Sequence, residues 1–168
     1  MQDIYIKDIG KGFPLVLVHG FLGSSEMWEP QIEYFKKDYR VIVPALPGFG
    51  KSNTIDSCDS IECMAKAILN LLEKKEIKNF NLLGHSMGGM IVLEMTKLVG
   101  KKILKLICYV TGPRGNIHGR FETIEQSREK LKINGLDVTA NRMAKTWFID
   151  GEKTKYFIYV MKLANKPL

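Results

Sequence analysis

The chain has 168 residues, of which 45% are hydrophobic and 26% are charged, so it can bury one core and does not have the composition of a disordered protein. Its 25 Lys and Arg against 18 Asp and Glu give a formal charge of +7, which favours anionic partners: nucleic acid, an anionic membrane surface or an acidic carrier protein. The basic residues occur as scattered pairs and not as one tract, which argues against nucleic acid as a partner.

The cysteines are odd in number and lack the C-x-x-C spacing. We therefore expect Cys58, Cys63 and Cys108 to be reduced thiols, with no disulfide framework and no metal site. No signal-peptide pattern opens the chain, and no apolar run approaches the ~18 residues that span a membrane. A cytoplasmic protein without metal or cofactor is the resulting expectation.

Five short apolar segments predict strands, and the first of them ends at a turn over residues 10–12. The predicted strands cover residues 4–6, 15–18, 40–43, 79–83 and 103–110. Several are apolar on both faces, which is typical of parallel strands that helices cover on each side. Helical patterns lie between them, so the alternation predicts an α/β fold with a doubly wound, mostly parallel sheet.

The helical patterns have apolar residues at helical spacing. They cover residues 28–35, 61–72 and 90–98, the last stopping at Gly100. Asp59, three residues before Glu62, resembles a capping box for the second helix. After Pro113 the pattern changes, because residues 114–168 give helical stretches at 121–133, 138–148 and 153–164 and no further strand signal.

Residues 84–88, Gly-His-Ser-Met-Gly, stand between the fourth predicted strand and the third helix. A serine on such a tight strand-to-helix turn is a nucleophile elbow, and the glycines remove side chains that would collide where the backbone doubles back. The hydroxyl of Ser86 is then presented at the carboxyl end of the strand. The N-terminus of the following helix favours the negative charge of an acyl-transfer intermediate.

A second glycine-bearing loop, residues 19–23, directly follows the second predicted strand. An oxyanion hole needs two backbone N–H groups aimed at one point. We expect Phe21 to supply one N–H from this loop and Met87, which follows the nucleophile, to supply the other. His19 and His85 are interpreted as residues that bond locally or shape the pocket entrance, and not as the catalytic base.

Three stretches together, residues 12–20, 47–52 and 84–89, resemble the α/β-hydrolase family in order and spacing. The resemblance is to the branch of carboxylesterases, enol-lactonases and carbon–carbon bond hydrolases, and it covers residues 4–113. It implies a hydrolase core over residues 1–113, a partial helical cap over 114–168, and a C-terminal part of the core that this chain does not contain. It also implies a Ser86 acyl-enzyme and a small ester, lactone, thioester or related acyl substrate.

The family's catalytic triad places its acid and its histidine on loops after later strands. Those strands are not in this sequence, and the only histidine after Ser86 is His118, which we interpret as a solvated loop residue. The triad acid and base are therefore expected to be absent, with impaired turnover as the result. The family usually has an aspartate at the position of Ala45, so one hydrogen bond that orders the loop is also expected to be absent.

The substrate pocket is predicted to be lined by apolar side chains from both halves of the chain. The expected lining residues are Phe21, Leu22, Trp28, Met87 and Trp147. Two other functions remain open. Residues 45–52 fit a relaxed phosphate-loop pattern, although a polar segment separates them from the next helix. The chain could also be a non-catalytic binding module that keeps the sheet and the pocket.

Overall fold

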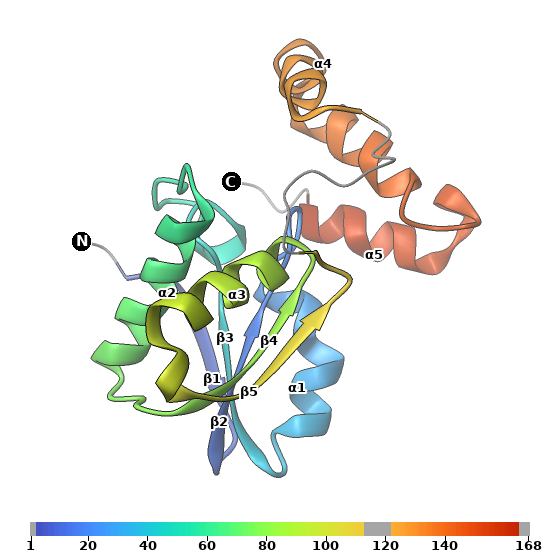
Figure 1. Cartoon of the computed structure of the whole chain (residues 1–168). Coiled ribbons are helices and arrows are strands. Elements are labelled where there is room, and N and C mark those ends of the chain that lie inside the picture. Colours follow the sequence, from blue (N-terminus) through green and yellow to red (C-terminus); the bar gives the residue numbers. More distant parts are fainter. Residues whose placement is uncertain (1–2, 113–121, 165–168) are drawn as a thin grey trace. The chain divides into compact units, whose positions relative to one another are not determined.

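The computed structural model describes residues 3–112 and 122–164, in which five strands form one sheet (Figure 1). The strands are β1 (Ile6–Ile9), β2 (Phe13–Val18), β3 (Tyr39–Pro44), β4 (Phe80–His85) and β5 (Ile103–Tyr109). Their order is β1-β3-β2-β4-β5, with β1 antiparallel to β3 and the other neighbours parallel. The predicted α/β class with a mostly parallel sheet is confirmed.

Helices cover both faces of this sheet, with α2 (Ile61–Lys74) and α3 (Met87–Val99) on one face and α1 (Glu29–Phe35) on the other (Figure 1). Alternate residues of a strand point to opposite faces, so β2 contributes to two cores. Val16 and Val18 are buried in the larger core with residues of α2 and α3. Leu15 and Leu17 are buried in the smaller core with Ile32 of α1.

Two details at the start of α2 correct the predictions from sequence. The N-cap is Ser60 and not Asp59, because the Ser60 hydroxyl accepts the N–H of Cys63 at 3.2 Å. Cys58 and Cys63 form a disulfide, so the expectation of three reduced thiols is wrong. The turn at Ser60 brings the two Cα atoms to 5.6 Å, a separation that a disulfide spans, while Cys108 stays free and exposed.

The two edges of the sheet differ in chemistry. The β1 edge carries charge, because Lys7 pairs with Glu29 and Asp8 accepts two hydrogen bonds from Arg40 at 2.8 and 2.7 Å. The guanidinium of Arg40 lowers the pKa of Asp8 below its ordinary value. The β5 edge is apolar and pairs only with β4 among the described residues, and its Ile107 side chain is 51% exposed.

Residues 114–167 form a second compact unit, whose described part is helical. It contains α4 (Ile124–Lys145) and α5 (Lys155–Ala164), and Gly135 breaks α4 with a non-helical φ of 76°. The three predicted helical stretches are thus present, the first two as the halves of α4. His118 lies outside the described residues.

Inside this unit the carboxylate of Glu122 is buried among polar partners. It accepts hydrogen bonds from Arg142 at 2.6 and 2.9 Å, from Lys130 at 2.8 Å and from Ser127 at 2.5 Å. The hydrogen bond from Arg142 is the main reason that the pKa of Glu122 falls to about 2. The two cationic side chains compensate the buried negative charge. The ion pairs and hydrogen bonds of Glu122 therefore hold the segment before α4 against the helix.

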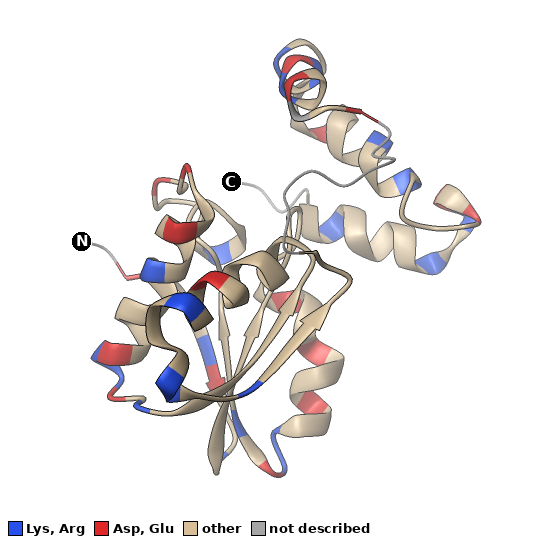
Figure 2. Ribbon diagram, viewed as in Figure 1, with Lys and Arg blue, Asp and Glu red and all other residues tan. Residues whose placement is uncertain are grey.

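Positive and negative side chains are interspersed over the described elements, without a continuous basic tract along one of them (Figure 2). Several are paired, such as Lys66 with Glu62 at 2.7 Å and Lys97 with Glu94 at 3.0 Å. None of the helices described is both long enough and apolar enough to cross a bilayer.

Candidate active site

The loops that follow β2, β3 and β4 meet at one end of the sheet. The chain passes from β2 to β3 on one side of β2, and then to β4 on its other side. In parallel sheets the point where the winding direction reverses leaves a crevice at the carboxyl ends of the strands, and ligands bind there. Both predicted functional loops, residues 19–23 and the turn at Ser86, lie at this end.

Ser86 links the end of β4 to the start of α3 in a strained conformation. Its φ is 54° and its ψ is −120°, and a positive φ is uncommon for a residue with a side chain. The backbone is fixed there, because the Ser86 N–H donates to the Tyr109 carbonyl at 3.0 Å and the Ser86 carbonyl accepts from Gly89 at 2.9 Å. Its side chain makes no capping hydrogen bond to α3. Such strain is typical of functional sites.

The glycines of the motif are explained by how closely the backbone segments approach. A Cβ atom on Gly84 would lie 2.3 Å from the carbonyl oxygen of Gly88, and one on Gly88 would lie 2.3 Å from that of Val18. Real Cβ atoms are not found at such distances. The α3 helix can therefore start directly against β2 and β4 only with glycine at these positions.

Gly20 brings the predicted oxyanion loop against the serine. A Cβ atom on Gly20 would lie 3.0 Å from the Cβ of Ser86, so the loop after β2 and the elbow are in direct contact. Phe21 follows Gly20 and is 44% exposed, with its ring 6.2 Å from that of Phe49. Met87 is the first residue of α3, where N–H groups lack partners within the helix. The oxyanion roles of Phe21 and Met87 stay predictions.

The predicted pocket residues have different surroundings. Leu22 is buried with a φ of 57°, and Met87 packs against the larger core. Trp28 is buried in the smaller core beside Ile32, and Trp147 belongs to the second unit, where it is 46% exposed. Their contribution to a substrate pocket stays a prediction.

His19 is a structural residue of this site. It is fully buried, and its ring bridges two loops: Nδ1–H donates to the Gly20 carbonyl at 2.9 Å, while Nε2 accepts the N–H of Leu46 at 3.0 Å. Burial lowers its pKa to about 4, so the ring is neutral at neutral pH. With both nitrogens used, His19 has none for Ser86, in agreement with the local role predicted for it.

His85 precedes the serine and is half-buried, with its ring centroid 5.6 Å from that of Tyr109. Burial also lowers its pKa. It and His19 are the two histidines within the described ranges, and neither stands as a base for Ser86. The absence of the triad acid and base from this chain stays a prediction.

The loop after β3 is ordered by other groups in place of the expected aspartate. The Ser52 hydroxyl donates to the Ala45 carbonyl at 3.0 Å and accepts the Tyr5 N–H at 2.8 Å. Phe49 extends from this loop to His19, with ring centroids 5.6 Å apart, a contact that the sequence analysis did not predict. The signal was present, since Phe49 belongs to one of the three stretches that carry the family resemblance.

A family model described as the alpha/beta hydrolase fold matches residues 14–133. The chain belongs to this family. Among curated relatives of this α/β hydrolase, (E)-2-((N-methylformamido)methylene)succinate hydrolase of Acinetobacter baylyi is 32% identical over 87% of the chain and 54% of its own length. Pimeloyl-[acyl-carrier protein] methyl ester esterase of Legionella pneumophila is 35% identical over 67% of the chain and 44% of its own length.

Solved structures agree with the assignment. A thermophilic esterase from Thermogutta terrifontis matches this α/β hydrolase with a TM-score of 0.82 and 26% identity, over 96% of the chain and 61% of the esterase. The enol-lactonase of Burkholderia xenovorans matches with a TM-score of 0.83 at 20% identity, over 96% of the chain and 64% of the lactonase, a likeness of fold. The chain spans about half the length of the two curated relatives.

Proposed function

We propose that the protein is the N-terminal part of a serine hydrolase that cleaves a carboxylic ester, a lactone, a thioester or a related small acyl compound. The observation that carries the proposal is the conformation of Ser86, which has a φ of 54° and makes no capping bond to α3. Its neighbour Gly20 is close enough to bring a second loop to the same point. Membership in the α/β hydrolase family supports the same chemistry.

In the proposed reaction, the Ser86 hydroxyl oxygen attacks the carbonyl carbon while a histidine takes its proton. The N–H groups of Phe21 and Met87 donate to the oxyanion that forms, and the leaving group departs as it is protonated. Water then releases the acyl group from Ser86. The histidine and its acid belong to a C-terminal part of the core, and residues 114–168 form part of a cap.

The substrate is proposed to be anionic or carried by an acidic protein. One relative is named a hydrolase of a substituted succinate, and another a methyl ester esterase of pimeloyl-[acyl-carrier protein]. The formal charge of +7 would attract either kind of substrate. We expect the protein to be cytoplasmic, in a compartment where such small acyl compounds are available.

The nucleotide-binding alternative has little support in the loop of residues 45–52. A phosphate loop leads directly into a helix whose N–H groups meet the phosphates, whereas α2 begins only at Ile61. The Ser52 hydroxyl is also occupied on both sides, by Ala45 and Tyr5. A non-catalytic binding module remains the second candidate, because the described residues contain no base positioned for Ser86.

The test is covalent labelling of the folded 168-residue chain by a fluorophosphonate, with imidazole added as a substitute base. We expect slow labelling at Ser86 that accelerates with imidazole concentration, and none in Ser86→Ala. His118→Ala is the matched control, and its labelling should equal that of the parent chain. A chain that shows native circular dichroism but no labelling at any imidazole concentration would overturn the hydrolase proposal in favour of a binding module.

A further inference from the structure

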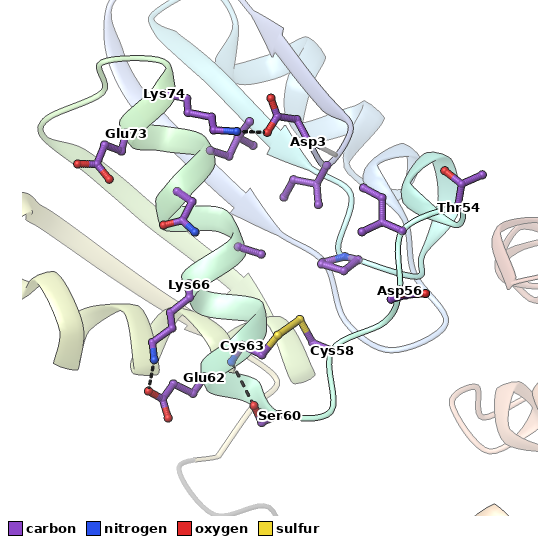
Figure 3. A pocket seen from close by; sticks show the side chains of 16 residues that line it. Asp3, Thr54, Asp56, Cys58, Ser60, Glu62, Cys63, Lys66, Glu73 and Lys74 are labelled. Carbon is purple, nitrogen blue, oxygen red and sulfur yellow. Dashed lines mark hydrogen bonds and ion pairs between the residues drawn. A yellow bond between two sulfur atoms is a disulfide. The ribbon is translucent and has the colours of Figure 1, made fainter. Parts of the chain in front are cut away.

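The disulfide between Cys58 and Cys63 lies at the N-terminus of α2, beside a cavity of about 1020 Å³ (Figure 3). Cys63 is the third residue of the helix, and its N–H donates to the Ser60 cap. Both cysteines are half-buried and both line the cavity. A small reagent can therefore reach the sulfur atoms without unfolding the protein.

The position of the bond favours its reduction. The two cysteines are five positions apart, and a bridge over so short a segment restricts the unfolded chain less than a long-range bridge does. A helix N-terminus stabilises a thiolate, so Cys63 is the better leaving group when the bond is broken. In a cytoplasmic protein, the location that the sequence predicts, disulfides are usually transient and serve catalysis or redox sensing.

We propose that Cys58 and Cys63 form a thiol–disulfide exchange site for a dithiol, which releases residues 53–60 when it is reduced and fixes them when it is oxidised. One thiolate of the dithiol attacks the sulfur of Cys58, and the electron pair of the broken bond leaves on Cys63, which takes up a proton. The second thiol of the reagent then attacks the mixed disulfide, leaves as a cyclic disulfide and returns Cys58 as a thiol. Two electrons and two protons pass from the dithiol to the protein.

The fixed segment is in contact with the loop that supports the candidate active site. A Cβ atom on Gly48 would lie 2.6 Å from the Cβ of Ser57, the residue directly before Cys58. Next to Gly48, the Phe49 ring contacts the rings of Phe21 and His19. Since Phe21 is the proposed oxyanion donor, the redox state would change the reactivity of Ser86, a consequence that rests on the proposed function.

The first measurement is chemical and uses the chain with Cys108→Ser, which removes the free exposed thiol. The protein is equilibrated with mixtures of reduced and oxidised dithiothreitol and then alkylated. Mass spectrometry gives the number of alkyl groups added. We expect no alkylation of the oxidised protein and two alkyl groups on the reduced one, in native buffer. The proposal is overturned if no disulfide forms in oxidising buffer, or if reduction requires a denaturant.

The second measurement follows amide hydrogen exchange in both redox states. The N–H of Ile55, inside the released segment, donates to the Ser52 carbonyl, and the N–H groups of Gly48 and Ser52 donate within the adjoining loop; exchange of all three should speed up by about tenfold on reduction. The N–H of Lys75, which donates to Leu71 near the end of α2, serves as the internal control and should not change. Unchanged exchange in the loop would refute its release.

A third measurement separates this proposal from the proposed function. The rate of fluorophosphonate labelling at Ser86, with imidazole present, should fall several-fold on reduction and also in the double variant Cys58→Ser, Cys63→Ser. If Ser86 never reacts, the hydrolase proposal fails, while alkylation and exchange still decide the redox site. If Ser86 reacts equally in both states, the link from the disulfide to Phe21 is refuted.

Discussion

At the residue scale, the position of Ser86 depends on neighbours that have no side chain. Gly88 lets α3 begin against β2, and a Cβ at that position would overlap the Val18 carbonyl. We therefore expect Gly88→Ala to lower the free energy of unfolding by about 3 kcal/mol, because the overlap is with backbone and cannot be relieved by a rotamer change. Urea denaturation followed by circular dichroism measures the loss.

Gly100 provides the matched control for that substitution. It follows α3 with an α-helical φ of −49°, and the nearest neighbour that an added Cβ would meet is the Thr96 methyl at 4.0 Å. Gly100→Ala should leave stability unchanged or raise it by about 0.5 kcal/mol through the unfolded state. Equal losses in the two variants would contradict the overlap argument.

His19 gives the protein a pH-dependent stability. The unfolded chain binds a proton at this residue below its ordinary pKa of 6.5, whereas the folded protein does so only below about 4. The contribution of His19 to the free energy of unfolding should thus be complete above pH 6.5, fall by about 3 kcal/mol between pH 6.5 and 4, and level off below. Denaturation at a series of pH values measures the slope.

Two variants identify the group behind this slope. His19→Gln removes the titrating ring but keeps an amide that can donate to Gly20 and accept from Leu46, so its slope between pH 6.5 and 4 should be shallower. His85→Gln should change the slope less, because His85 is only half-buried. A slope unaltered in His19→Gln would show that another group causes it.

At the element scale, two adjacent residues at the start of α2, Asp59 and Ser60, are candidates for the N-cap. The Ser60 hydroxyl accepts the N–H of Cys63, so Ser60→Ala should cost about 1 kcal/mol of stability. Asp59→Ala should cost less than about 0.5 kcal/mol, because Asp59 is exposed and precedes the cap. Chemical denaturation of both variants in the oxidised state decides which residue is the cap.

The carboxylate of Glu122, with its partners Ser127, Lys130 and Arg142, makes the stability of the helical unit sensitive to acid. Because Arg142 lowers the pKa of this carboxyl to about 2, the folded unit keeps it charged where the unfolded chain takes up a proton. Its contribution is complete above the ordinary pKa of 4.5 and is lost as the pH falls toward 2. Glu122→Gln should therefore melt at a lower temperature than the parent at pH 7, with a smaller difference at pH 3.

The melting curves should be recorded for the helical signal of the full chain. Glu125→Gln is the control, since Glu125 is an exposed carboxylate three residues further on, in the first turn of α4. It should show the parent's melting temperature at both pH values. A constant difference between Glu122→Gln and the parent from pH 7 to pH 3 would contradict the linkage.

Much of the fold could be predicted from sequence because its signals are local. Burial on both faces gives β2 and β3 continuous apolar runs, and burial on one face gives α2 its helical spacing of apolar residues. The cap at Ser60 was missed by one residue, because Asp59 and Ser60 are both good caps and geometry decides between them. The Cys58–Cys63 bond was missed because spacing alone does not show that a turn brings the two residues together.

The candidate site was predictable in part. The Gly-x-Ser-x-Gly pattern identifies the turn at Ser86, since only glycine allows such close approaches at Gly84 and Gly88. The roles of His19 and Phe49 depend on contacts between distant loops, and sequence reasoning assigned His19 only a local bond. The break in α4 at Gly135 was expected from the gap between two helical patterns.

At the scale of the whole molecule, the open β5 edge is the main liability. Its Leu104 and Ile107 side chains are 60% and 51% exposed, next to backbone groups without a partner strand among the described residues. Such edges pair with other chains. We expect the purified protein to self-associate with rising concentration, and Ile107→Lys to weaken that association by at least about tenfold.

Sedimentation velocity over a range of concentrations tests this expectation. Tyr34→Lys is the control, because Tyr34 is 70% exposed on the helix α1 and not on a strand, and its replacement should leave association unchanged. Equal effects of the two substitutions would show that general surface hydrophobicity, and not the edge, drives association.

The charged edge at β1 determines how far such association can proceed. Asp8 and Arg40 hold each other there, and Lys7 is paired with Glu29, so β1 is a short edge strand with charged side chains, which disfavour edge-to-edge pairing. Among the described strands, β5 is then the edge that favours pairing, and the simplest contact between two identical edges is a two-fold axis. A pair joined in this way buries both β5 strands and leaves no free adhesive edge. We therefore expect self-association to stop at a closed pair, without growth into filaments.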